Sequence, residues 1–544
     1  MTENKCRLLR ATWIEQMNGE VIAILATLTL GAALRHAMAA VPPLPEVAYR
    51  NSVIFLQALR HPGYVLALLA GSSVYILTQR GRQIVRWSML EPVHLRWFVV
   101  LITWPLAWYY STYDYNFYFD QTHGWDRALL VLLWLGVLAS PALLLPFLLQ
   151  CVILIRQFDY PDVLQYSWTD KSLPLAFACC FWAYCIVACF TRRAELKRLL
   201  IVVMAIFAAH YFGPGVQKVS LGEHPLDWAL NNSLHHLFVA ATRSGWLDRV
   251  DPMSVMSIAH WLERATIPLQ LATLAFELGA VLVFWDRRAV LAAALGAVFL
   301  HASIFLSSGI LFWKWVIVDL SVLAFVGVIW REGMSHIAAE RKLAAIATLL
   351  VPLATVIYGV PLLGWHDTQY LASYEIMAQD TSSRHFSLSR QFFAPYDMVF
   401  SQNRFRFLAP QPVLPVGTLG STQDSDLRRE IAAATPETLP ALIERLGVRR
   451  FDPDKKRSFN AFLADFIDGA NRRGIHRVVP EWLRAPSHIW LEGGENPQPL
   501  ATPITHASVE FREYLLDPFP SHPYRRAVLD DVHIPISLRG GFSR

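Results

Sequence analysis

The sequence predicts a polytopic α-helical membrane protein of about nine transmembrane helices, followed by a C-terminal extracytoplasmic α+β domain that is partly β-rich. Three observations lead to this fold class. Hydrophobic residues make up 54% of the 544 residues and charged residues only 17%, which is untypical of a soluble globular protein. Apolar runs recur through the first two thirds of the chain. After Gly364 the composition becomes polar, and no further run is long enough to span a membrane.

Ten apolar runs are candidates for membrane spans, because a helix needs about 20 mostly apolar residues to cross the hydrocarbon core. The run 97–112 is short. The run 128–155 is long and contains Pro141 and Pro146, so it is interpreted as a kinked span or a hairpin. The candidate runs are 21–41, 54–78, 97–112, 128–155, 172–190, 199–212, 265–285, 289–308, 311–330 and 344–363.

Basic residues in alternate loops give an orientation, since cytoplasmic loops are enriched in lysine and arginine. If the basic loops face the cytoplasm, so do residues 1–20, whereas the loop 213–263 and residues 365–544 lie outside. The count then requires one re-entrant or doubled segment between residues 97 and 155, which gives nine crossings and a membrane domain of residues 21–364. The basic residues are Arg80, Arg82, Arg86, Arg192, Arg193, Lys197, Arg198, Arg287, Arg288, Arg331, Arg341 and Lys342.

Several function classes have no support in the sequence. The formal net charge of +5 is spread along the chain, so no nucleic-acid partner is predicted. The six cysteines form no zinc-like pair, and no metal site is predicted. Nucleotide, flavin, zinc-protease and serine-hydrolase motifs are not found. The lack of a presequence and of cysteine pairs favours the bacterial inner membrane as the location.

The polar C-terminal third is expected to be a mixed domain of modest size. Residues 385–388 and 398–400 are predicted to form short strands. Residues 436–446 and 458–473 have the apolar spacing of amphipathic helices.

One lysine at the end of an apolar run organises the functional interpretation. The run 199–212 carries no charge, and Lys218 follows a Gly-Pro-Gly sequence at 213–215. This sequence predicts that the helix breaks, because proline lacks an amide hydrogen and clashes with the preceding turn. Lys218 is then expected on irregular backbone at the membrane edge. It is either a side chain that reaches water from a helix end, or a desolvated amine that can act as a base.

Three further polar residues lie within or beside apolar runs. His301 is either bonded to a neighbouring helix backbone or part of a site. Glu277 is a functional candidate because an acid within a span is costly. Its carboxyl either stays protonated or pairs with Lys218, His301 or Arg264. His210 is a candidate with a weaker case.

Aromatic residues crowd the segment 104–119, which contains nine of them. The segment is interpreted either as an interfacial belt or as the wall of an aromatic ligand pocket. Lys314, between Trp313 and Trp315, is expected to be an interfacial anchor.

Three short motifs carry a resemblance to a known family. They are Tyr211-Phe212, then Gly215-Val216-Gln217-Lys218, then Asp227-Trp228. Together they resemble the signature of the vitamin K-dependent gamma-carboxylase family, which belongs to the wider HTTM (horizontally transferred transmembrane domain) group. Phe299-Leu300-His301 is similar to the Phe-His pair that opens a later span in that family. Residues 365–544 stand where the family has its beta-rich extracytoplasmic domain.

The resemblance implies an enzyme that couples oxidation of a reduced quinone by dioxygen to proton abstraction and carboxylation of a substrate, peptidyl glutamate in the family. It implies that Lys218 is the catalytic base and that His301 supports the quinone oxygens. His210, Glu277 and Trp228 are assigned to the quinone or substrate pocket. The implied cofactors are a reduced, vitamin K hydroquinone-like quinone, dioxygen and carbon dioxide.

The partners expected on this reading are the lipid membrane, the quinone and a peptide or protein substrate at the C-terminal domain. The alternative is a non-enzymatic membrane binding or assembly protein, in which Lys218 and Glu277 are a buried structural pair. A transporter ranks last, because only one predicted helix break is visible and no second one matches it.

Overall fold

The computed structural model describes residues 3–84, 87, 90, 93–113, 115–164, 167–191, 195–473, 479–497, 500–516 and 522–535. Arg86, Arg192 and Arg193 of the predicted cytoplasmic loops lie outside these ranges.

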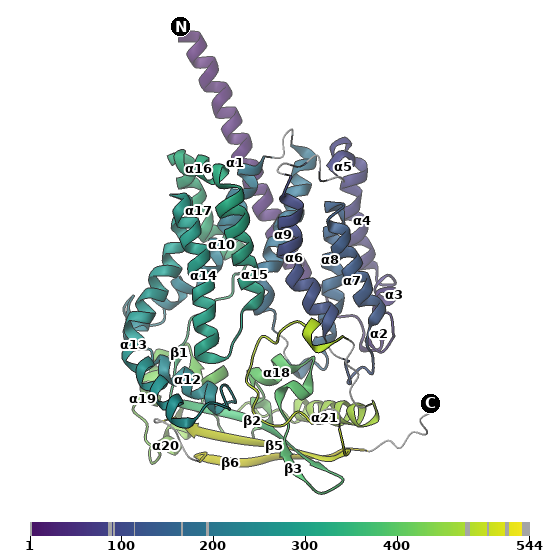
Figure 1. The fold of residues 1–544 in the computed structure, drawn as a ribbon, viewed down its shortest axis with the longest axis vertical. Helices are drawn as coiled ribbons and strands as arrows, with labels where there is room; N and C mark the ends of the chain where they lie inside the picture. The colour runs from purple at the N-terminus through teal and green to yellow at the C-terminus, as the bar shows by residue number, and fades with distance from the viewer. Residues whose placement is uncertain are drawn as a thin grey trace.

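A bundle of helices stands on a smaller domain that is built around a β-sheet (Figure 1). The N-terminus lies at the end of the bundle away from the sheet, where α5 and α16 also lie. The helices before the C-terminal domain are α1 (Glu3–Ala40), α2 (Glu46–Tyr49), α3 (Ile54–Ala58), α4 (Pro62–Leu77), α5 (Gln79–Ile84), α6 (Leu95–Thr112), α7 (Gly124–Val137), α8 (Leu144–Ile155), α9 (Ser172–Phe190), α10 (Leu196–Val219), α11 (Asp227–Asn231), α12 (Leu234–Arg243), α13 (Pro252–Gly279), α14 (Arg287–Ser308), α15 (Trp313–Val322), α16 (Arg331–Ala339) and α17 (Arg341–Ile357). Of these, α12 lies beside the sheet (Figure 1).

Six helices within the described residues are long and apolar enough to cross a membrane, or seven if the bent pair 313–329 and 331–339 counts as one span. The prediction of a helical membrane protein with a smaller β-containing part is therefore confirmed in outline. Large apolar side chains stay exposed on the outside of α14, among them Leu295, Phe299 and Leu306. Such exposure is expected where a helix contacts lipid instead of protein.

The long apolar run 128–155 forms two helices, as the hairpin interpretation predicts. α7 ends at Val137, and α8 begins at Leu144 and packs back against it. Ser140 accepts a hydrogen bond from the backbone N–H of Ala142 at the turn.

The predicted helix break at residues 213–215 is wrong. α10 continues through Pro214, and Lys218 lies in its last turn. A Cβ added to Gly213 would lie 2.9 Å from Thr355 Cγ2, and one added to Gly215 would lie 2.9 Å from Glu277 Cβ. The two glycines therefore let α17 and α13 approach α10 closely, as small residues do between membrane helices. Packing of this kind also tolerates a proline within a span.

The C-terminal domain contains a four-stranded antiparallel sheet with the strand order β3-β2-β5-β6. A two-stranded sheet, β1 with β4, lies where the chain leaves the bundle. The elements are β1 (His366–Asp367), β2 (Tyr370–Asp380), β3 (His385–Ser387), α18 (Asp397–Gln402), β4 (Ser421–Thr422), α19 (Ser425–Ala432), α20 (Leu439–Leu446), α21 (Pro453–Arg473), β5 (Ile504–Leu515) and β6 (Arg525–His533).

The predictions for this domain are partly right. The strand at 385–388 and the helices at 436–446 and 458–473 correspond to β3, α20 and α21. The strand predicted at 398–400 is wrong, because these residues form part of α18. The three longest strands, β2, β5 and β6, were not predicted.

The aromatic segment that follows α6 contacts the C-terminal domain. The Phe117 ring lies 5.5 Å from the ring of Phe466, and the Tyr118 ring lies 5.2 Å from that of Phe462. Both phenylalanines belong to α21. This part of the segment is therefore neither an interfacial belt nor a pocket wall, but a packed contact between the bundle and the domain.

We expect Phe466→Ala to destabilise this contact. Phe466 is fully buried between Phe117 and the aromatic core of the domain, and truncating such a side chain costs about 3–5 kcal/mol of unfolding free energy. Thermal unfolding and limited proteolysis of the detergent-purified protein measure the effect. Phe451→Ala, at a position 42% exposed, is the matched control. Equal stability of the two variants would contradict the contact's role.

Candidate functional site

Lys218 and Glu277 form a buried ion pair between α10 and α13. The Lys218 ammonium Nζ donates to Glu277 Oε1 at 2.6 Å and to Oε2 at 2.8 Å. Lys218 is 7% exposed and Glu277 4%. Of the partners considered for Glu277, the structure therefore brings Lys218 to it, whereas Arg264 is exposed on the outer side of α13.

The Lys218–Glu277 pair lies close to residues 364–365, where the chain enters the C-terminal domain. Lys218 Nζ lies 5.2 Å from the centre of the Trp228 ring. The Trp228 indole donates to the carbonyl of Trp365 at 2.7 Å, and the Gln217 side chain accepts from the N–H of Gly364 at 2.7 Å. The predicted residues Lys218, Glu277 and Trp228 thus come together, and the start of the C-terminal domain is bonded to the same end of α10.

A second polar cluster lies deeper in the bundle. The Tyr211 hydroxyl donates to Asp319 Oδ1 at 2.6 Å and contacts His301 Nε2 at 3.2 Å. His301 Nε2 lies 3.6 Å from Asp319 Oδ2. All three side chains are buried, and neither His301 Nδ1 nor Asp319 Oδ2 has a hydrogen-bond partner among the described residues.

Asp319 was missed by the sequence analysis. It is an acid inside the apolar run 311–330, so the rule that singled out Glu277 applies to it equally. Phe299, the first residue of the motif that contains His301, is 71% exposed and does not join the cluster.

The two clusters occupy different levels of the bundle. Tyr211 precedes Lys218 by seven residues on α10, which is about 10 Å along a helix that rises 1.5 Å per residue. His301 is therefore not a direct neighbour of Lys218. The Tyr211 ring also contacts Phe276, the residue before Glu277, at 5.5 Å, so packed side chains join the two levels.

His210 does not join either cluster through a hydrogen bond. Its Nδ1 bonds to the carbonyl of Ile206, one turn earlier on α10, at 2.8 Å. The ring packs against Trp315 with a centroid separation of 5.5 Å. His210 is thus buried and bonded to its own helix through Nδ1, whereas its Nε2 has no hydrogen-bond partner among the described residues.

The expectation that Lys314 is an interfacial anchor is wrong. Lys314 is 1% exposed, and its Nζ donates to Asp170 Oδ2 at 2.7 Å. Lys171 donates to the other oxygen, Asp170 Oδ1, at 2.6 Å. The Tyr109 ring lies 4.2 Å from Lys314 Nζ. The reason for the burial is that the C-terminal domain covers this end of α15, where the His488 backbone bonds to Leu311.

Asp367 brings a carboxyl from the C-terminal domain to the neighbourhood of Lys218. Its Oδ2 accepts from the Asn232 amide at 2.9 Å, and its backbone N–H donates to Asn232 Oδ1 at 2.6 Å. Burial raises the pKa of Asp367 to about 7, although Asn232, Trp365 and the positive charge of Lys218 act in the opposite direction.

A cavity of about 980 Å³ is lined by residues of both the bundle and the C-terminal domain. Phe312 belongs to the bundle, whereas Trp365, Met398 and His488 belong to the C-terminal domain. The Phe312 ring stacks on His301 with a centroid separation of 5.3 Å. Neither Lys218 nor His301 lines the cavity. Phe312, which stacks on His301, does line it, and so does Trp365, whose carbonyl accepts a hydrogen bond from Trp228.

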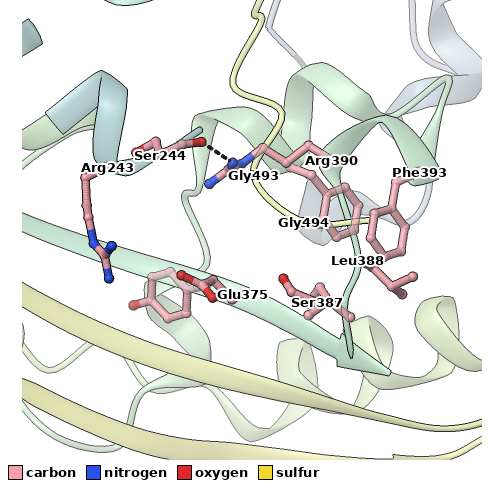
Figure 2. A pocket seen from close by; sticks show the side chains of 12 residues that line it. Arg243, Ser244, Glu375, Ser387, Leu388, Arg390, Phe393, Gly493 and Gly494 are labelled. Carbon is pink, nitrogen blue, oxygen red and sulfur yellow. Dashed lines mark hydrogen bonds between the residues drawn. The ribbon is translucent and has the colours of Figure 1, made fainter. Parts of the chain in front are cut away.

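A second, smaller cavity of about 150 Å³ lies within the C-terminal domain and beside the end of α12 (Figure 2). Arg243, Glu375 and Arg390 contribute charged side chains to it, and the Arg390 guanidinium donates to the carbonyl of Ser244 at 2.7 Å. None of the residues predicted from the sequence lines this cavity.

Within the described part of the chain, no group of three histidine, cysteine or acidic side chains is arranged to hold a metal ion. Comparisons with protein families, with curated proteins and with solved structures found no match.

The pKa of Asp367 leads to a prediction about stability. The unfolded chain loses this proton near pH 4 and the folded protein near pH 7, so the free energy of unfolding falls as the pH rises between these values. A difference of about three pKa units corresponds to at most ~4 kcal/mol. Asp367→Asn should remove this loss, so that the variant gains stability over the wild type from pH 4 to pH 8.

Chemical unfolding across this pH range measures the effect. Asp248→Asn, at an exposed position, is the control and should leave the pH dependence unchanged. A parallel pH dependence of Asp367→Asn and wild type would show that Asp367 is not held protonated.

Proposed function

We propose that this protein is an integral-membrane enzyme similar to the vitamin K-dependent carboxylases, in which Lys218 abstracts a proton from a reduced quinone. The observation that carries the proposal is the contact of a buried amine with both oxygens of a buried carboxylate. The resemblance of the motifs around Lys218 and Trp228 supplies the reaction class.

Glu277 gives the lysine a way to become a base. An ammonium cannot accept a proton, so it must first lose one. Both charges of the Lys218–Glu277 pair have lost most of their hydration, which narrows the free-energy gap between the ion pair and a neutral amine beside a carboxylic acid. Glu277 therefore takes the Lys218 proton across the 2.6 Å hydrogen bond, and the amine then accepts a proton from an acidic hydroxyl.

The side chains near the pair are of the types that bind a flat ring with two oxygens. Tyr211, Trp228 and Phe312 offer aromatic faces at the two levels. His301 Nδ1 and Asp319 Oδ2 are buried polar atoms without a hydrogen-bond partner among the described residues, and such atoms favour a ligand with a complementary oxygen or hydroxyl. When bound, a reduced quinone with dioxygen supplies the driving force for removing a weakly acidic carbon proton, and carbon dioxide adds at that carbon.

In this proposal, His301 orients a quinone oxygen and Asp319 holds Tyr211 and His301 in place. The apolar bundle excludes water, which would otherwise quench a strong base. The carboxyl acceptor, a peptide or protein, reaches the site from the cavity beneath the C-terminal domain.

The same proposal includes nine crossings of a bacterial inner membrane, with the N-terminus in the cytoplasm and residues 365–544 outside. Lys197 pairs with Glu340 at 2.9 Å, which brings two predicted cytoplasmic loops together. α16, in one of these loops, lies at the end of the bundle opposite the sheet (Figure 1). This arrangement supports an orientation in which the basic end is cytoplasmic.

A non-enzymatic membrane assembly protein is the second candidate. It is favoured by the completeness of the Lys218–Glu277 pair, because both carboxylate oxygens are bonded to the lysine. Here the pair would only connect α10 to α13. The two candidate functions predict different turnover for a variant in which both charges of the pair are removed.

Three variants separate the two functions. Lys218→Met and Glu277→Gln each leave one buried charge unpaired, which costs about 3–5 kcal/mol of unfolding free energy. The double variant Lys218→Met/Glu277→Gln leaves no unpaired charge and should regain most of that stability. Epoxidation of a reduced naphthoquinone should fall by 10²–10⁴-fold in Lys218→Met, the range typical of a lost general base, and should stay low in the double variant.

Turnover is measured by oxygen uptake and naphthoquinone epoxide formation in detergent, with thermal unfolding in parallel. Lys197→Met, which breaks an ion pair at the far end of the bundle, is the control and should retain turnover. Recovery of turnover in the stable double variant would remove the amine from the mechanism and leave the assembly role.

A further inference from the structure

The lining of the large cavity includes three arginines that have no acidic partner among the residues that the structure describes. Arg404, Arg406 and Arg450 line the 980 Å³ cavity on the side of the C-terminal domain. No carboxylate among the described residues lies within ion-pair distance of any of them. Lys455, also in the lining, is 3.8 Å from Asp452.

The local sequence fixes two of these arginines on the cavity side. In Arg404-Phe405-Arg406-Phe407 the two phenylalanines are buried. Their rings pack on Phe459 of α21, with centroid separations of 4.9 and 6.0 Å. Arg404 and Arg406 both line the cavity, as does Phe407, and the two phenylalanine contacts anchor the segment that carries the arginines.

The preceding residue joins the same segment to the sheet. The Asn403 side chain accepts from the N–H of Tyr374 and donates to the carbonyl of Ala372, at 2.9 and 3.3 Å. Both acceptor and donor belong to β2. The backbone of Arg404 and Arg406 is therefore held in place, and only their side chains must become ordered when they bind a ligand.

The charges in this part of the lining do not compensate each other. Asp424 also lines the cavity, but its carboxylate accepts from the N–H groups of Asp426 and Leu427 and caps α19. Partial burial lowers the pKa values of Arg404 and Arg406, and the positive charges of Arg450 and Arg404 lower the pKa of Arg406 further. Like charges held together without a partner are relieved by an anion, and guanidinium groups match phosphate oxygens in geometry.

The bundle contributes apolar side chains to the lining of the same cavity. Leu362 and Leu363 follow α17, the last helix before the C-terminal domain, and Ile310 and Phe312 follow α14. Leu237 of α12 adds to this wall. A ligand that contacts both the arginines and these apolar side chains needs an anionic headgroup and a hydrocarbon chain.

We propose that this cavity binds a phosphate-bearing amphiphile drawn from the bilayer, with the phosphate among Arg404, Arg406 and Arg450 and the hydrocarbon along Leu362 and Phe312. Three cations match a phosphate monoester, which carries about −1.5 to −2 charges at neutral pH. A strongly acidic peptide would place its charges against the apolar wall. The cavity volume is at the upper end of the range for ligand sites, about 300–1,000 Å³. The arginines are separate from the residues proposed to react at Lys218, although the carboxyl acceptor of that proposal reaches Lys218 through the same cavity.

Lipid binding by the full-length protein in nanodiscs tests the proposal. Dioleoyl phosphatidic acid supplies the phosphate monoester, dioleoyl phosphatidylcholine is the neutral comparison, and inorganic phosphate alone is the soluble comparison. We expect Arg404→Gln/Arg406→Gln to lose at least tenfold in affinity for phosphatidic acid. Arg445→Gln/Arg449→Gln is the matched control, since these exposed arginines pair with Glu430 and Glu444 outside the cavity, and it should bind as the wild type does.

Two further measurements test whether the bound phosphate belongs to a lipid and whether the lipid's hydrocarbon contacts the apolar lining. Leu362→Gln keeps all three arginines, and we expect it to weaken phosphatidic acid binding without changing the response to inorganic phosphate. It also serves if the double arginine variant does not fold. Equal affinity of the wild type for the two lipids, inorganic phosphate binding as tight as the lipid, or preferential binding of a polyglutamate peptide would each overturn the proposal.

Discussion

The buried pair of Lys218 and Glu277 is the interaction on which the functional end of the bundle depends. It connects the last turn of α10 to the C-terminal part of α13. The helices can approach closely enough only because residue 215 is glycine, since a Cβ there would lie 2.9 Å from Glu277 Cβ. A Gly-Pro-Gly sequence that would end a soluble helix thus serves here to bring an amine and a carboxylate together.

The same end of α10 is also where the bundle meets the C-terminal domain. Gln217 and Trp228 bond to Gly364 and Trp365, and Asn232 bonds to Asp367 in the first strand. The domain therefore does more than follow the spans in the chain. It covers the pair, contributes a carboxyl next to it, and closes one side of the large cavity.

Sequence reasoning found the parts of this arrangement that depend on local rules. A charge or an imidazole inside an apolar run must have a partner, and Glu277 and His301 follow that rule. It failed where packing overrides a local signal. Pro214 does not end α10, and Met398–Phe400 belong to a helix although their composition favours a strand.

The strands β2 and β5 were missed for a related reason. Both are largely covered on their two faces, so the alternation of apolar and polar residues that marks a half-buried strand is blurred. Neither Asp367 nor the cluster of Arg404, Arg406 and Arg450 could be predicted from local sequence patterns, because the residues around them come from distant segments of the chain. Asn232 and Asp367 are 135 positions apart, and only the fold brings them together.

The most direct test of the central claim is to observe where the Lys218 proton goes. Infrared difference spectroscopy of the purified protein, recorded before and after addition of a reduced naphthoquinone, reports the carbonyl stretch of a protonated carboxylic acid. We predict that such a band appears on addition, that it is lost in Glu277→Gln, and that it remains in Asp367→Asn. A spectrum without this band, or one in which the band persists in Glu277→Gln, would contradict the proposal that Glu277 takes the lysine proton.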